Sequence, residues 1–379
     1  MKSDEESVES TGLLNETVLH ENEEATKLKN NFWTGIGLAW IAVLCCAPEG
    51  ILMRASQVAH RKGSRHDFIH HGTYVFWVCL GKGIVQLALT NATSTEGGSY
   101  IPASNTGWLC AFLGVLGGVG AVGFYGYGNL LTTAVMSYTF YYSYSLWTAL
   151  FAVLVQDTPV PVSTWIAMSL VTASLVGMFL DSVYGYDPTT ANIKKHDGIH
   201  GPNVTGNILC LVAAVCLALY LNATVYVSKH KELSHLPMTL YFGFGSILGA
   251  LFIGIPLIIS EGTSVFHGMD DMTSLWISLL CCVGSSYYFL LSVAVKYIGS
   301  THTAIISTSD MILGPIISNF LFHEVVSVTA IFCQSVVLMT VIIHEFEMAK
   351  LAKVQCLECV PVRANDDAQT LGEPPSARA

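Results

Sequence analysis

Charged residues are scarce in this sequence. Only 12% of the 379 residues are charged, whereas 52% are hydrophobic, and the mean hydropathy is +0.53. Soluble domains contain about 25% charged residues, so this composition excludes an ordinary soluble protein and predicts an integral membrane protein. The formal net charge of -10, much of which lies in the first thirty residues, argues against nucleic-acid binding.

Several motifs of other protein classes are also missing. The N-terminus is polar and acidic, unlike a signal peptide, so the first apolar segment is expected to serve as a signal anchor. Most cysteines lie inside apolar runs, where cysteine acts as a small hydrophobic residue. The exceptions, Cys356 and Cys359, form a single CxxC, which is too little for a zinc site. Hydrolase and metalloprotease motifs are absent, and we expect no enzyme, no metal and no cofactor.

A GxGxxG pattern occurs at Gly118, Gly120 and Gly123. No strand precedes it, and the surrounding residues form a glycine-rich apolar run, so this context excludes a dinucleotide site. Small residues at this spacing let membrane helices approach each other closely. We therefore expect these glycines to serve helix packing.

Long apolar runs occupy most of the chain. A helix needs about 20 mostly apolar residues to cross a bilayer, and continuous rather than alternating runs favour helices over strands. We therefore predict an all-α integral membrane protein with about ten transmembrane helices. The predicted spans are residues 33–52, 72–90, 107–127, 131–154, 165–183, 204–227, 238–259, 273–295, 303–322 and 325–343.

The chain divides into two similar halves. Residues 127–157 align without a gap with residues 294–324, both stretches end on a carboxylate, and Gly117 coincides with Gly284. An odd number of spans in each repeat forces the second copy to be inverted, as in many secondary transporters. The predicted organisation is an acidic disordered N-terminal tail (1–31), a first five-helix repeat (32–183), an inter-repeat loop (184–203), a second five-helix repeat (204–345) and a C-terminal tail (346–379).

Residues 294–327 read AVKYIGSTHTAIISTSDMILGPIISNFLFHEVVS. This stretch resembles the signature of EamA-type proteins in the drug/metabolite transporter superfamily, which are related to the nucleotide-sugar and triose-phosphate transporter families. Lys82 lies where those families often carry an arginine, but His323 replaces their glycine before the closing Glu324. The resemblance covers most of the chain and implies two inverted EamA-like repeats, cytosolic termini and one central substrate cavity. It names no substrate.

Residues 306–317, ISTSDMILGPII, place a carboxylate and a helix breaker inside an apolar span. A charge at the bilayer centre costs at least about 2.5 kcal/mol, so Asp310 is expected to face a water-filled cavity or a partner. Ser307 and Gly314 share its helix face, and Pro315 frees a backbone carbonyl and bends the helix. We predict Ser307 and Asp310 as cavity residues and Gly314 and Pro315 as a kink. A structural hydrogen bond from Asp310 is the alternative.

Lys82 lies near the middle of the second span, at the depth predicted for Asp310. The two are expected to pair or to share a charged solute, and Gln86 lies one turn along the same face. Glu49 lies near the end of the first span. A headgroup position beside Arg54 and a role as a gate or proton carrier are both left open.

Tyrosines cluster in two corresponding spans. Tyr138, Tyr141 and Tyr142 follow helical spacing in the fourth span, and Tyr287 and Tyr288 occupy the matching region of the eighth. Tyrosine hydroxyls need partners in a lipid environment, so both sets should point inward. We predict that they line the cavity, with simple packing as the alternative.

The N-terminal tail contains ESTGLL, in which Glu9, Leu13 and Leu14 resemble an acidic dileucine sorting signal. Such a signal favours a eukaryotic endosomal, lysosomal or vacuolar membrane over the plasma membrane. A chance match is the alternative.

Together these features predict a multi-pass transporter that moves a small organic solute by alternating access through a midplane cavity between two inverted repeats. The expected partners are this solute, of unknown class, and the lipid bilayer, whereas proton coupling and a homodimer are left open. A non-transporting membrane receptor or scaffold and an integral membrane lipid-handling enzyme are the alternatives. The enzyme would need a cluster of His and Asp at one interface, which the sequence does not contain.

Overall fold

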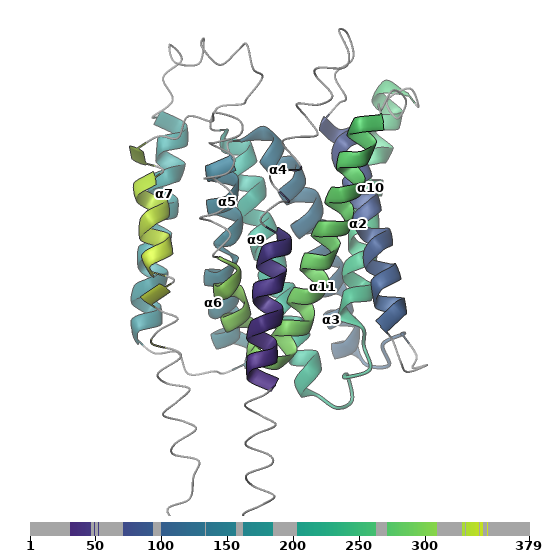
Figure 1. Cartoon of the computed structure of the whole chain (residues 1–379), viewed down its shortest axis with the longest axis horizontal. Helices are drawn as coiled ribbons and strands as arrows, with labels where there is room; N and C mark the ends of the chain where they lie inside the picture. The colour runs from purple at the N-terminus through teal and green to yellow at the C-terminus, as the bar shows by residue number, and fades with distance from the viewer. Residues whose placement is uncertain are drawn as a thin grey trace, which may run out of the picture.

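The computed structural model describes residues 31–46, 49, 52, 71–93, 100–132, 134–156, 162–184, 203–262, 271–308, 328–329, 331–340, 342–343 and 347. Its main elements are α2 (His71–Thr93), α3 (Asn105–Gly118), the π-helix η1 (Val119–Phe124), α4 (Tyr125–Leu131), α5 (Ala134–Tyr142), α6 (Tyr144–Gln156), α7 (Val162–Tyr184), α9 (Val204–Lys229), α10 (Met238–Glu261) and α11 (Asp271–Ser307). Shorter apolar helices, Asn31–Cys46 and Ile331–Thr340, lie near the two ends of the chain. The described part is all-helical, and its helices run roughly side by side (Figure 1).

Within the described part, five helical stretches are long and apolar enough to cross a membrane. They are Gly72–Thr93, Asn105–Leu131, Val204–Lys229, Met238–Ile259 and Asp271–Ala304. Each overlaps a span predicted from the sequence, so an all-α membrane protein with several spans is confirmed. The number of ten helices, the inversion of the repeats and the domain boundaries stay predictions, and most of the predicted ninth span lies outside the described residues.

The predicted fourth span is not one continuous helix, because α5 ends at Tyr142 and α6 begins at Tyr144. At the junction, the Ser143 hydroxyl donates to the carbonyl of Phe140 over 2.6 Å, and the Ser145 hydroxyl donates to that of Tyr142 over 3.2 Å. Hydroxyls that bond to the preceding turn compete with the backbone hydrogen bonds and bend helices. The expectation of one uninterrupted helix is therefore wrong here.

The long element α11 consists of two helices that meet at Gly299. This residue has φ 81° and ψ 165°, a conformation that is essentially restricted to glycine. The turn lies between the predicted spans 273–295 and 303–322. The residues after Gly299 therefore begin a separate helix, as the sequence predicts.

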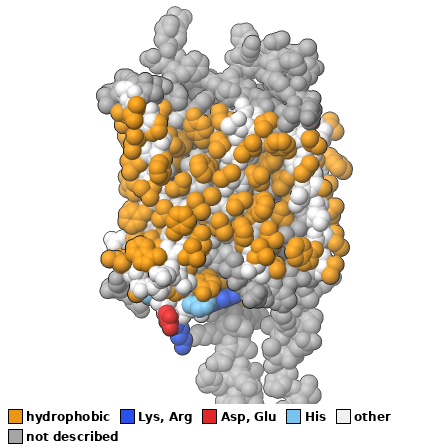
Figure 2. All heavy atoms as spheres, turned by 180° about the vertical axis from the view of Figure 1, so that it is seen from behind, with side chains coloured by type: hydrophobic (Ala, Val, Ile, Leu, Met, Phe, Trp, Pro, Cys, Tyr) orange, Lys and Arg blue, Asp and Glu red, His pale blue; other side chains and the backbone are white. Residues whose placement is uncertain are grey.

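The outer surface is apolar over most of its height. Figure 2 shows hydrophobic side chains across one whole face, with charged and histidine side chains gathered below them. Phe252 is 70% exposed and Ile259 is 80% exposed. An apolar surface of this extent marks contact with a membrane.

Glycines bring α2 and α3 into close contact with α10. A methyl group at Gly118 would lie 2.7 Å from the backbone nitrogen of Ser246, and one at Gly83 would lie 2.9 Å from the carbonyl oxygen of Gly243. Any larger residue would push these helices apart. The expected role of the glycine-rich third span in helix packing is confirmed.

Candidate functional site

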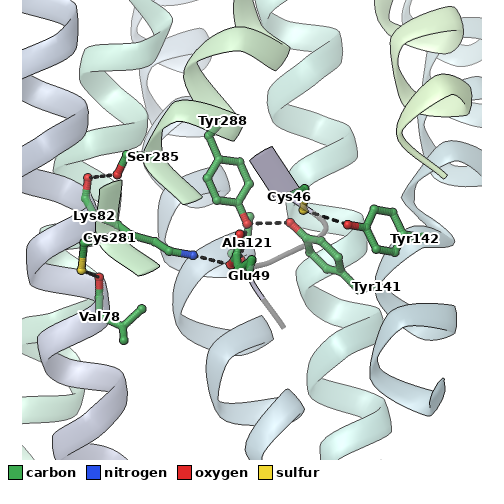
Figure 3. A network of polar contacts seen from close by, with 10 residues as sticks. All are labelled: Cys46, Glu49, Val78, Lys82, Ala121, Tyr141, Tyr142, Cys281, Ser285 and Tyr288. Atoms are coloured by element: carbon green, nitrogen blue, oxygen red, sulfur yellow. Dashed lines mark hydrogen bonds and ion pairs between the residues drawn. The ribbon is translucent and has the colours of Figure 1, made fainter. Parts of the chain in front are cut away.

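A buried ion pair lies inside the helix bundle. Lys82, in the middle of α2, and Glu49, which follows the helix Asn31–Cys46, are 2% and 1% exposed. Lys82 Nζ donates to Glu49 Oε1 (Figure 3). Each charge would be costly to bury alone, and pairing compensates both. The headgroup position considered for Glu49 is therefore wrong.

Gly284 of α11 provides the space for this pair. A methyl group at Gly284 would lie 2.5 Å from Lys82 Cε, 2.7 Å from Lys82 Nζ and 3.1 Å from Glu49 Oε2. One residue further along α11, the Ser285 hydroxyl donates to the backbone carbonyl of Lys82 over 2.9 Å. The ion pair is thus enclosed between α2 and α11.

The Gln86 side chain and one oxygen of the paired Glu49 lack hydrogen-bond partners among the described residues. Gln86, one turn after Lys82 on α2, is 1% exposed, and neither its side-chain nitrogen nor its oxygen has a hydrogen-bond partner among the described residues. Within the same residues Glu49 Oε2 also has none. Buried polar groups are normally hydrogen-bonded. An unsatisfied amide and an unsatisfied carboxylate oxygen therefore indicate a place for a polar ligand or water.

Tyr288 connects the ion pair to a network of tyrosines (Figure 3). Its ring centroid lies 5.5 Å from Lys82 Nζ, and its hydroxyl donates to the carbonyl of Ala121 over 3.0 Å. Because that hydroxyl has a single proton, the Tyr141 hydroxyl, 2.8 Å away, acts as donor to Tyr288. Ala121 lies in η1, and π-helical turns frequently occur at functional sites.

The other tyrosines extend this network. Tyr142 and Cys46 share a hydrogen bond of 2.9 Å between hydroxyl and thiol, and the hydroxyls of Tyr144 and Tyr287 lie 3.3 Å apart. The ring of Tyr138 stacks on that of Tyr142 with centroids 5.7 Å apart. All four tyrosines are at most 1% exposed. Their hydroxyls are therefore polar groups buried inside a largely apolar core.

The structure buries every predicted cavity residue that it describes. These are Lys82, Gln86, Tyr138, Tyr141, Tyr142, Tyr287, Tyr288 and Ser307. Burial alone leaves open whether they contact a solute, so that role stays a prediction. Six further predicted residues lie outside the described part, namely Asp310, Gly314, Pro315, Glu9, Leu13 and Leu14.

The sequence predicted that Lys82 would pair with Asp310 or share a charged solute with it, and in the described part the partner of Lys82 is Glu49. The prediction also missed Tyr144 and Tyr125, whose ring stacks on Tyr141 at a centroid distance of 4.0 Å. The density of tyrosines in YYSYS around Ser143 was a signal for Tyr144. No sequence signal placed Tyr125, because its contact depends on how η1 and α4 pack against α5.

Apolar helices around a buried polar centre define an integral, multi-pass membrane protein. Residues 204–344 match the EamA-like transporter family. This match, which covers less than half of the chain, confirms the resemblance over the predicted second repeat, and the matched family is described as one of transporters.

Comparison with curated proteins finds no match. Among solved structures, one titled "Crystal structure of protein" aligns with a TM-score of 0.54 and 15% sequence identity, covering 84% of this chain and 99% of that chain. At this level of identity the similarity shows a shared fold alone.

Proposed function

We propose that the protein is a transporter that moves a small organic solute by alternating access through a midplane cavity between two inverted five-helix repeats. The observation that carries the proposal is the buried Lys82–Glu49 pair beside the unsatisfied side chain of Gln86. Ionisable residues within membrane helices are costly and usually belong to solute or ion pathways.

The ion pair offers a charged solute a defined place. An anionic group of the solute could take the position of Glu49 beside Lys82, and a cationic group could take the position of Lys82 beside Glu49. Either exchange compensates the residue that binds the solute, and the displaced side chain stays compensated only if it is neutralised by proton transfer or meets an opposite charge on the solute. The Gln86 amide, which can both donate and accept, could then orient the solute.

The tyrosine network supports movement between two halves. Tyr141 and Tyr144, from the first predicted repeat, bond to Tyr288 and Tyr287, from the second. Each net hydrogen bond contributes only about 1 kcal/mol. A few such bonds can break and form again when one repeat rocks against the other.

Uptake into proteoliposomes tests the proposal. The parent protein is assayed with labelled nucleotide sugars, amino acids and phosphorylated sugars, and the transported solute is then used for Lys82→Met, Glu49→Gln and Asp310→Asn. We expect each substitution to lower uptake at least about tenfold, because a lost charge-assisted contact is worth about 1.5–3 kcal/mol.

The matched control is Lys231→Met, which removes an exposed lysine from the loop between α9 and α10 and should leave uptake unchanged. Undiminished uptake in the Lys82 and Glu49 variants would refute the site. Absence of uptake for every solute by the folded parent would favour the receptor or scaffold. Chemical conversion of a lipid by the parent would favour the enzyme.

A further inference from the structure

A cavity lies at the end of α2, away from the ion pair. Its volume is about 260 Å³, and it is formed by α2, α9, the start of α10 and α11. The residues that line it are Thr90, Thr93, Thr224, Pro237, Met238, Thr239, Phe289, Ser292, Val293 and Lys296.

Lys296 is the one charged residue in this lining, and five of the other side chains carry a hydroxyl. It is exposed and forms no ion pair or hydrogen bond with another described side chain. Four of these hydroxyls donate to backbone carbonyls of their own helices, which leaves that of Thr239 as a donor in the lining. Lys296, which has no carboxylate partner among the described residues, therefore supplies the main contact for an oxygen-bearing anion.

The start of α10 adds to this potential. Pro237 is the N-cap of the helix, and no side chain caps it. The first amide groups of a helix carry partial positive charge, which favours an anion nearby. Lys296 and the start of α10 therefore both attract an anion that enters the cavity.

Two residues of the cavity lining lie close, along their helices, to residues of the central site. The Thr90 hydroxyl donates to the carbonyl of Gln86 over 2.8 Å, and the Ser292 hydroxyl donates to the carbonyl of Tyr288 over 2.6 Å. Each cavity hydroxyl thus lies one helical turn from a residue of the site on the same helix. The cavity and the central site are thus neighbours along α2 and α11, and Lys82 lies one turn beyond Gln86 on α2.

We infer that this cavity is an entry site for a soluble small anion that carries a phosphate or carboxylate group, with Lys296 as its first cationic contact. The inference rests on the proposed transport function and assigns to it a solute class. It also assigns a route, because the anion would pass from Lys296 to Lys82 along hydroxyl-bearing faces of α2 and α11.

The test measures the charge preference of the cavity without requiring transport. Thr93→Cys is introduced into a variant in which Cys282, Cys356 and Cys359 are replaced by serine. The protein is then reconstituted in phosphatidylcholine vesicles. Rates of modification are compared for the anionic reagent sulfonatoethyl methanethiosulfonate and its cationic trimethylammonium counterpart. Adding Lys296→Gln should lower the ratio of anionic to cationic rates roughly five- to tenfold.

Competition identifies the ligand. Millimolar inorganic phosphate or succinate should slow modification of Thr93→Cys, and Lys296→Gln should abolish this protection. The matched control, Lys231→Gln, removes an exposed lysine outside the cavity lining and should change neither result. Lys296→Arg keeps the charge and should preserve both, which separates a charge effect from damage to the fold.

An unchanged rate ratio in Lys296→Gln, or no protection by either anion, overturns the inference. Protection that requires phosphatidylglycerol in the vesicles overturns it as well, because the site would then bind a lipid headgroup. If the cavity results hold but Lys82→Met transports every tested solute normally, the central site fails and the anion site stands.

Discussion

At the scale of single residues, the centre of this protein buries a few polar and charged side chains among apolar ones. Lys82 and Glu49 can be buried because they compensate each other, and Gly284 supplies the volume that they need. Removal of one partner from a buried pair leaves an uncompensated charge, whereas removal of both need not destabilise. This asymmetry can be measured.

A first prediction concerns the pair itself. Lys82→Met or Glu49→Gln alone should lower the free energy of unfolding by about 3–5 kcal/mol. The double variant should lose less than the sum of the two single losses, because it leaves no unpaired charge. Thermal unfolding in detergent, with Lys231→Met as control, measures this coupling. Additive losses would contradict the contact between the two side chains.

A second prediction concerns the space beside the pair. Gly284→Ala places a methyl group 2.5 Å from Lys82 Cε, so the pair must shift, at a cost of about 1–3 kcal/mol. In the control, Gly37→Ala, nothing lies within 4 Å of the new methyl group, and alanine favours a helix by about 0.5–1 kcal/mol. Unfolding temperatures should therefore fall for the first variant and not for the second. Equal behaviour would show that Gly284 does not hold the site open.

At the scale of elements, departures from regular helix occur where the polar network lies or where one span ends. The π-helix η1 presents the carbonyl of Ala121 to Tyr288, and the break at Ser143 separates Tyr142 from Tyr144, each of which has its own hydrogen-bond partner. These irregularities place hydroxyl groups that a straight helix would direct elsewhere.

The turn at Gly299 gives a prediction at this scale. Gly299→Val forces a β-branched residue into φ 81°, ψ 165°, which should cost about 1–3 kcal/mol. No other atom lies within 4 Å of the position of a Cβ, so the loss would come from the backbone alone. Gly37→Val, at a helical glycine with equally open space, is the control for thermal unfolding. A similar small loss in both would argue against a required turn.

At the scale of the whole molecule, the packing has the pattern expected for two related halves. The third predicted span, which contains α3, packs against the sixth, α9. The first span packs against the eighth, since Ala39 and Val43 share a buried hydrophobic cluster with Ala294 of α11. In the proposed repeats, the third span corresponds to the eighth and the sixth to the first. The contact between the third and sixth spans therefore has its counterpart in the contact between the eighth and first. This relation supports the repeat proposal.

An even number of spans predicts that both termini lie on one side of the membrane. Impermeant maleimide labelling of His235→Cys and Gly262→Cys, which lie beyond opposite ends of α10, should occur from opposite sides of sealed vesicles when Cys282, Cys356 and Cys359 are serine. Protease-accessible tags on the N- and C-termini should be cleaved from the same side as that on which His235→Cys reacts. Tags cleaved from opposite sides would show an odd number of spans and contradict the ten-helix plan.

The sequence predicted the long helices better than the contacts between their side chains. Apolar runs of sufficient length located the five long helical stretches, and the scarcity of charge within them singled out Lys82. The sequence related Lys82 to Asp310, by pairing or by a shared solute, and gave no indication that Glu49 contacts Lys82. Depth along a helix can be counted from sequence, but which helices face each other cannot.

The sequence by itself determined that this is a helical membrane protein, because an apolar chain in lipid must satisfy its backbone hydrogen bonds within each segment. It also marked the residues that are costly to bury. Only the tertiary structure decided which of these compensate one another, since the Lys82–Glu49 pair, the Tyr288–Ala121 bond and the cavity at Lys296 join segments far apart in the chain. Such contacts depend on close helix packing at glycines, which fixes distances between helices that no local pattern encodes.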